Sequence, residues 1–145
     1  MESSTLEGLP PWAMEMLSHA RVARLGLLDD ELSPRVLPVT FALHEGTLWS
    51  AVDEKRKRLR GRAIARVRYL EQRPRAALTV DHYEDDWSAL AWVQALGNVE
   101  VIDVERAAAG LHALRVKYDQ YRERAPAGPL LRFEPERFVF WRAGG

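Results

Sequence analysis

The chain has 145 residues, and its 21 Lys and Arg side chains balance 21 Asp and Glu, so the formal net charge is zero. This length suggests a single domain over residues 1–145 with a helical segment in residues 1–20, and the balanced charge argues against a whole surface built to bind nucleic acid. Cysteine is absent, which excludes disulfides, thiolate nucleophiles, iron–sulfur clusters and cysteine zinc sites. With no secretory signal and no run near the ~20 apolar residues of a membrane span, we expect no membrane partner and a cytoplasmic location.

The first third of the chain predicts one helix and three strands. Pro10 and Pro11 precede an apolar run, an arrangement typical of the first turn of a helix. Alternating apolar residues then predict strands separated by turn sequences, which we expect to pair as an antiparallel meander. The predicted strands cover residues 21–28, 35–43 and 47–52.

The middle of the chain predicts a helix over residues 59–72, where apolar residues recur at helical spacing until Pro74 ends the pattern. Two strands follow, over residues 76–83 and 90–102. We expect the second of these to bend at Gly97-Asn98, because glycine inside a strand often marks a bulge or a close approach.

The last third predicts a helix over residues 104–121, capped by Asp103, and a final strand over residues 137–141. Strands joined by short turns, with few helices between them, are typical of an antiparallel barrel with helices packed outside. The sequence therefore predicts a mainly β protein with flanking helices, built on a six-stranded antiparallel β-barrel.

Residues 55–75 concentrate ten of the basic side chains against one acid, Glu71. The stretch directly follows a predicted strand and enters a predicted helix, where backbone N–H groups and the helix dipole also favour anions. This pattern indicates a phosphate or polyanion site, and the alternative is a solvated basic helix face. A nucleic-acid interface is a third interpretation, which the zero net charge and the lack of a recognised nucleic-acid motif disfavour.

Residues 81–87 contain Asp81, His82 and Glu84, residue types that can bind a metal ion. The acids crowd one turn, however, and His82 is the only histidine near them. We therefore expect an acidic hairpin turn and no metal site.

Four tryptophans, Trp49, Trp87, Trp92 and Trp141, are candidates for stacking on a planar cofactor ring, although tryptophan on a strand more often lies in a core or an interface. The sequence lacks a nucleophile elbow, a Walker motif and a GxGxxG fingerprint. These absences argue against the common hydrolase, nucleotide triphosphatase and Rossmann classes.

Several segments, taken in order, resemble the pyridoxamine 5′-phosphate oxidase-like split-barrel family. The segments are residues 24–28, 34–41, 46–55, 66–70 and 74–80. Residues 81–87 and the sequence Lys117-Tyr118-Asp119-Gln120-Tyr121 are similar to a branch of probable deazaflavin (coenzyme F-420)-dependent enzymes.

This resemblance implies a homodimeric FMN-binding split barrel, with flavin or deazaflavin in a groove between the subunits. The cofactor phosphate would lie against basic residues after the third strand and at the next helix, and the preceding strand would pass beside the ring. The implied cofactor-binding residues are Pro38, Val39 and Thr40 beside the ring, Ser50 and Val52 on the next strand, and Lys55, Lys57 and Arg66 at the phosphate. From the charge and aromatic patterns we add Arg58, which would steer the anionic tail, and Trp87, the candidate for stacking.

The resemblance also implies a function, an oxidoreductase that uses coenzyme F-420, or alternatively FMN, to transfer hydride to a small planar substrate. Ten basic residues are more than one FMN phosphate needs, which favours the longer anionic tail of F-420. The alternative is a non-catalytic protein that binds or carries a flavin or deazaflavin on the same barrel. The sequence designates no catalytic residue, and Tyr83 and His82 are the candidate proton donors.

Overall fold

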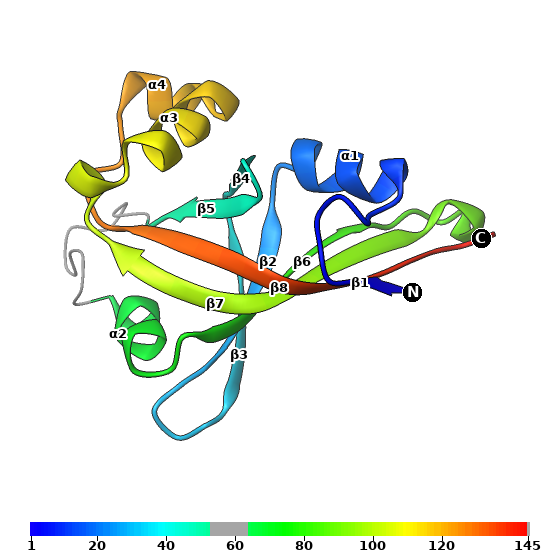
Figure 1. Ribbon diagram of the computed structural model, residues 1–145, viewed down its shortest axis with the longest axis horizontal. Helices are drawn as coiled ribbons and strands as arrows, with labels where there is room; N and C mark the ends of the chain where they lie inside the picture. Colours follow the sequence, from blue (N-terminus) through cyan, green and yellow to red (C-terminus); the bar gives the residue numbers. More distant parts are fainter. Residues whose placement is uncertain (53–63, 145) are drawn as a thin grey trace.

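A computed structural model describes residues 1–52 and 64–144 as a curled antiparallel sheet flanked by helices (Figure 1). The sheet order is β3-β2-β6-β7-β8-β5-β4, and β1 pairs with β8. The strands are β1 (Glu2–Ser3), β2 (Ala23–Leu28), β3 (Pro34–Val39), β4 (Ala42–His44), β5 (Thr47–Ala51), β6 (Arg75–His82), β7 (Ala91–Ile102) and β8 (Leu130–Arg142). The helices are α1 (Pro11–His19), α2 (Ala65–Gln72), α3 (Ala108–Lys117) and α4 (Asp119–Glu123), with 3-10 turns η2 (Trp87–Ala89) and η3 (Val104–Arg106). The predicted mainly β architecture is confirmed, with eight strands in the described part of the chain rather than six.

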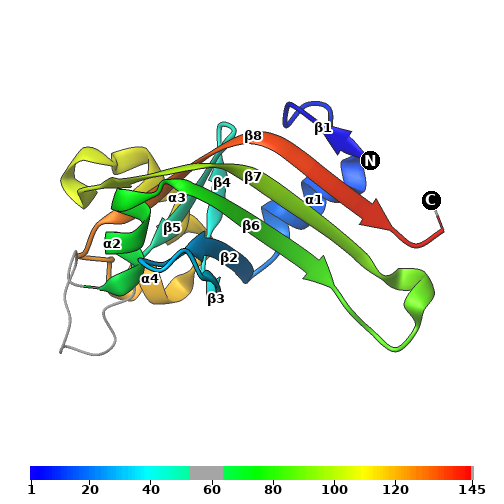
Figure 2. The same cartoon turned by 90° about the horizontal axis from the view of Figure 1, so that it is seen from below.

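The three long strands β6, β7 and β8 run side by side along the molecule (Figure 2). The pairing of β7 with β8 shifts register at Leu96 and Gly97, and Glu136 is the extra residue on β8. A Cβ atom at Gly97 would collide with the backbone carbonyl of Glu134, so the close approach of β8 requires glycine there. The predicted position of the irregularity is right, but the predicted bend in the strand is wrong in one respect, because β7 is continuous and β8 carries the bulge.

The predicted meander of three strands is right in its consecutive pairings and wrong in the continuity of its middle strand. β2 and β3 do pair, but the expected strand over residues 35–43 breaks into β3 and β4 at Thr40 and Phe41, which we call the link. β5 then pairs with β4 and β8. The link leaves the ladder because side chains, described below, take up its backbone groups.

Two apolar clusters hold the fold together. The main cluster lies inside the curl of the sheet and includes Leu17 of α1 and Leu70 of α2. A second cluster joins α3 to the outer face of β5, where Gly110 lies directly against the Trp49 ring. Trp49 is 7% exposed, so it belongs to this packing rather than to a stacking surface for a cofactor.

The predicted boundaries of the last helix and strand need correction. The expected helix over residues 104–121 is divided into η3, α3 and α4, with Tyr118 in an extended conformation between the two α-helices. Asp103 makes no side-chain capping hydrogen bond. β8 begins at Leu130, seven residues before the expected position 137, because Leu131 and Phe133 already pair with β5 and β7.

Across residues 1–52 and 64–144, no helix is long and apolar enough to cross a membrane.

Candidate functional site

The link between β3 and β4 contains Thr40, one of the predicted cofactor-binding residues. The Ser50 hydroxyl donates to the Thr40 backbone carbonyl at 2.6 Å. The Thr40 hydroxyl shares a hydrogen bond of 2.7 Å with the phenol of Tyr121 in α4. The structure therefore brings the predicted residues Thr40 and Ser50 together, and it adds Tyr121 to them.

Tyr118 fixes the other half of the link. Its buried hydroxyl receives the backbone N–H of Phe41 at 3.0 Å and donates to the carbonyl of Arg21 at 2.8 Å. Burial raises the pKa of the Tyr118 phenol, which keeps it protonated as a donor. One side chain thus ties the link to the segment that leads into β2. Sequence reasoning assigned Tyr118 no role beyond the family resemblance.

Lys117 covers the same link from the end of α3. Its Nζ lies 3.9 Å from the centre of the Phe41 ring and 5.5 Å from that of Tyr118, and it has no hydrogen-bond partner in the structure described. Burial, reinforced by the charge of Arg21, lowers the pKa of the Lys117 ammonium to about 8. The aromatic rings compensate part of the cost of burying this charge.

The other residues predicted to lie beside the cofactor ring or on the next strand, Pro38, Val39 and Val52, differ in whether their side chains are exposed. Val39 and Val52 are 6% and 2% exposed and pack in the main core, so neither side chain lies on an outer surface. Pro38 is exposed on β3, opposite Arg24. Of the segment from Pro38 to Thr40, only the first and last residues are accessible to a ligand through their side chains.

The start of α2 follows the basic stretch. Arg66 is half-buried in the first turn of α2, which contains no acidic residue and has no side-chain cap at Ile64. Backbone N–H groups at such a helix start favour an anion, so the donor set here fits a phosphate. Lys55, Lys57 and Arg58 lie outside the described residues, and β5 ends and α2 begins at the same end of the molecule (Figure 1).

The later part of the basic stretch is ion-paired. Arg68 lies 3.6 Å from Asp30, and Arg75 lies 2.8 Å from Glu136. These two arginines match the interpretation of a solvated basic face. The candidate anion site therefore leaves out Arg68 and Arg75.

Trp87 lies at the opposite end of the molecule, in the connection between β6 and β7 (Figures 1 and 2). We call this connection, together with the adjoining end of β8, the hairpin end. Its side chain is 69% exposed. Within one protomer the structure does not bring Trp87 together with Arg66 or Thr40. Trp92 and Trp141 face each other across β7 and β8, and Trp141 is 43% exposed.

The acidic residues of the hairpin end stabilise the turn. Asp86 accepts hydrogen bonds from the backbone N–H and the hydroxyl of Ser88, which lower its pKa. The His82 Nε2 lies 2.6 Å from a Glu84 carboxylate oxygen. Over the described ranges, no group of three His, Cys, Asp or Glu side chains could hold a metal ion.

A protein-family model described as pyridoxamine 5′-phosphate oxidase matches residues 9–142. The chain belongs to the pyridoxamine 5′-phosphate oxidase family. The family resemblance of the sequence is thereby confirmed over nearly the whole chain. None of the curated proteins compared with the sequence matches it.

Solved structures similar to this family member share its split-barrel fold. An F420 reductase is 18% identical, with a TM-score of 0.67 over 90% of this chain and 98% of the other. An FAD-binding protein from Mesorhizobium loti is 19% identical, with a TM-score of 0.64 over 96% and 97%. A heme-binding protein from Mycobacterium smegmatis is 22% identical, with a TM-score of 0.71 over 94% of this chain and 56% of the other. At these identities the similarity establishes the fold alone.

Proposed function

We propose that the protein is an oxidoreductase that binds coenzyme F-420, with FMN as the alternative cofactor, and transfers hydride to a small planar substrate. The observation that carries this proposal is the basic stretch, which runs from the end of β5 into the acid-free, uncapped start of α2 in a member of this family. The similarity to an F420 reductase supports the choice of cofactor.

The basic stretch would bind the anionic part of the cofactor. The Arg66 guanidinium and the first N–H groups of α2 would hold a phosphate together with Lys55 and Lys57, and Arg58 would attract the remaining negative charge. Ten basic residues exceed the need of a single phosphate, which favours a longer anionic ligand.

The link and β3 would support the ring. Ser50 and Tyr121 hold Thr40 in place, so the segment from Pro38 to Thr40 would present a fixed surface to a planar group. Val39 and Val52 would contribute by packing beneath this surface. The cofactor supplies the hydride chemistry when bound, and the residues named here bind and orient it.

The protein would act as a homodimer. Exposed aromatic side chains gather at the hairpin end, including Tyr83, Trp87 and Trp141 at 66%, 69% and 43% exposure. Large exposed apolar residues often mark an interface. A second copy would bring this end, with Trp87, against the cofactor bound by the first, as the resemblance implies.

A second candidate function is a non-catalytic protein that binds or carries the cofactor. The similarity to a heme-binding protein favours this second function, because the name of that protein describes binding and no reaction. Turnover of the reduced cofactor with a test acceptor distinguishes the two functions, since a carrier would bind the cofactor without turning it over.

The test is a fluorescence titration of the purified protein with F-420 and with FMN. Loss of one charge-assisted hydrogen bond to a phosphate costs about 1.5–3 kcal/mol, so Lys55→Ala, Lys57→Ala and Arg66→Ala should each weaken binding roughly 10- to 100-fold. Arg137→Ala, an exposed arginine on β8, is the control and should bind like the parent. If all four variants bind like the parent, the anion-site assignment is wrong.

A further inference from the structure

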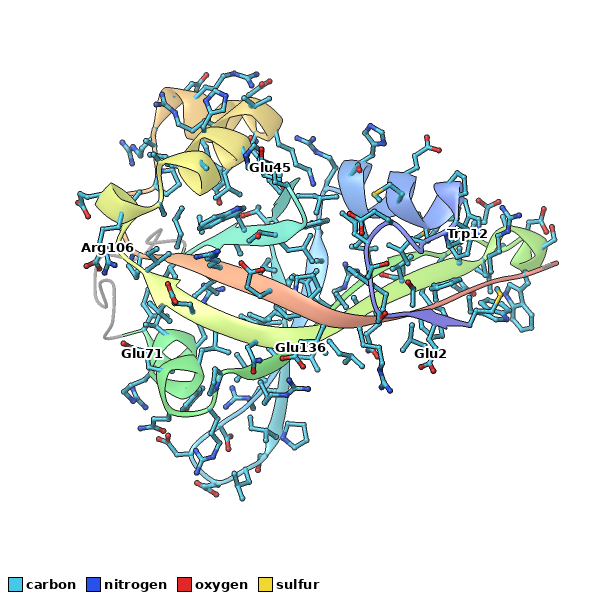
Figure 3. All side chains as sticks on the ribbon, viewed as in Figure 1. Glu2, Trp12, Glu45, Glu71, Arg106 and Glu136 are labelled. Carbon is cyan, nitrogen blue, oxygen red and sulfur yellow. The ribbon has the colours of Figure 1, made fainter. Side chains whose placement is uncertain are left out.

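A pocket of about 410 Å³ lies inside a single protomer, between α1, the hairpin end and the end of β8. Figure 3 shows Trp12 on α1 at this end of the molecule. The volume lies within the range of small-molecule sites. Its lining includes Trp12, Met16, His82, Ser88, Leu90 and Arg142.

The apolar wall of the pocket is suited to a flat ring. Trp12 is half-buried and held edge-on against Phe140, with ring centres 6.0 Å apart. Met16 and Leu90 complete the wall, and methionine adapts readily to the shape of a ligand. Such a wall can bury an aromatic ring without moving the backbone.

Arg142 supplies the charge of the pocket. Its guanidinium lies 5.3 Å from the centre of the Trp12 ring, and no carboxylate among residues 1–52 and 64–144 forms an ion pair with it. Other arginines of β8 differ, since Arg132 lies 2.7 Å from Glu134 and Arg137 lies 3.8 Å from Glu2. The Arg142 guanidinium therefore keeps its donors available for a ligand.

The remaining polar side chains of the lining do not compete for this guanidinium. The Ser88 hydroxyl donates to Asp86, and His82 pairs with Glu84, at 2.6 Å in both cases. Arg142 is thus the group that would recognise an anion, and a guanidinium matches the two oxygens of a carboxylate.

We propose that this pocket binds a small aromatic carboxylate, with its ring against Trp12, Met16 and Leu90 and its carboxylate on Arg142. Ser88, which lines the pocket, directly follows Trp87, the candidate for stacking on the cofactor. The aromatic carboxylate is therefore assigned as the substrate, and this assignment rests on the proposed function. Binding itself depends only on residues of one protomer.

The experiment titrates the cofactor-free protein with benzoate and with its neutral counterpart benzamide, following tryptophan fluorescence and ligand-detected NMR. Benzoate should bind saturably, and benzamide should bind about tenfold more weakly because it lacks the charge that Arg142 recognises. Arg142→Gln should weaken benzoate binding about tenfold or more and leave benzamide unchanged. Arg137→Gln removes a positive charge from the same strand outside the pocket and should change benzoate binding less than about twofold.

Three results would overturn the proposal: no saturable benzoate binding, equal binding of benzoate and benzamide, or equal losses in the two arginine variants. The cofactor titrations remain a separate measurement. Cofactor binding without benzoate binding refutes the ligand class alone. Benzoate binding without any cofactor binding refutes the proposed function and leaves the pocket as a ligand site.

Discussion

The link and the hairpin end differ in where their polar and aromatic groups point. At the link, the Tyr118 side chain is buried and its hydroxyl binds two backbone groups, while Thr40 is held by Ser50 and Tyr121. At the hairpin end, Trp87 is 69% exposed and the Arg142 guanidinium has no acidic partner in the described ranges. The polar groups of the link are bound within the protomer, whereas Trp87 exposes most of its side chain to solvent.

This difference bears on the location of the proposed cofactor site. The accessible residues of the Pro38–Thr40 segment and the start of α2 are the proposed ring support and the proposed anion site, whereas the stacking candidate Trp87 lies at the other end of the sheet. Under the proposed function, the two parts of the site lie at opposite ends of one protomer, and a second copy must supply Trp87.

The free energy of unfolding should be most sensitive to substitution where β7 and β8, which run between the two ends, lie against each other. In Gly97→Ala the new Cβ would collide with the backbone carbonyl of Glu134 in β8, so β7 and β8 must separate locally. We expect the free energy of unfolding to fall by about 2–3 kcal/mol, as measured by urea denaturation.

Gly26→Ala is the matched control for this substitution. A Cβ at Gly26 would meet the Cβ and the carbonyl oxygen of Ala77 at 3.8 and 3.9 Å and the carbonyl oxygen of Arg35 at 4.0 Å. These are ordinary contacts, so stability should change by less than about 1 kcal/mol. Equal effects of the two alanine variants would show that the strand crossing at Gly97 is not unusually tight.

The link should respond to the loss of a single hydroxyl. Tyr118→Phe leaves the ring in the second core cluster but removes the acceptor for the Phe41 N–H and the donor to the Arg21 carbonyl. Leaving these buried groups unsatisfied should lower the free energy of unfolding by about 1–2 kcal/mol. In Tyr83→Phe the lost hydroxyl belongs to a side chain that is 66% exposed, so this control should stay within about 0.5 kcal/mol of the parent.

Lys117 gives the link a pH dependence with a definite sign. Its pKa is about 8 in the folded protein and 10.5 as the ordinary value, so between these pH values the unfolded chain binds more protons. The cost of burying the ammonium is present in full below about pH 8 and disappears as the pH rises toward 10.5. Lys117→Met removes this cost, and its stability advantage over the parent should therefore shrink as the pH is raised from 7.5 to 9.5.

Lys117→Arg is the control, because arginine keeps its charge over the whole range. The stability difference between Lys117→Arg and Lys117→Met should stay constant from pH 7.5 to 9.5 in urea unfolding experiments. An advantage of Lys117→Met over the parent that is constant, or that grows with pH, would contradict the lowered pKa of Lys117.

How much of the fold the sequence could predict depends on the range of each interaction. Local patterns placed β2, α1, β6 and β7 close to their observed bounds, and the glycine signal located the irregularity at Gly97. The pairing of β5 with β8 joins segments about eighty residues apart, so no local pattern could reveal it. β8 was predicted too short because Pro135 and the charged residues around it hide the alternation of Leu131 and Phe133.

The candidate site was predictable to a smaller extent. Charge density alone located the basic stretch, and the resemblance located Thr40 and Ser50, which the structure joins. Charge density could not reveal that Arg68 is ion-paired, because its acidic partner comes from the distant turn at Asp30. Nor could alternation on β8 distinguish Arg142 from Arg137, since their difference depends on Glu2 and on Trp12.

The smallest expected effect belongs to Trp87. Its side chain is 69% exposed, so Trp87→Ala should change the free energy of unfolding by less than about 0.5 kcal/mol. If a second copy brings Trp87 against the cofactor, the lost aromatic contact should weaken F-420 binding by about 1 kcal/mol, or roughly fivefold.

Mixed dimers of Arg66→Ala and Trp87→Ala protomers then give the sharpest measurement, because one of their two sites would carry both substitutions and the other neither. If the site forms between protomers, half of the sites in the mixed dimer should bind F-420 with the parent affinity. If each site forms within one protomer, every site should be weakened. Unaltered F-420 binding by the Trp87→Ala variant alone would show that Trp87 is not part of the site.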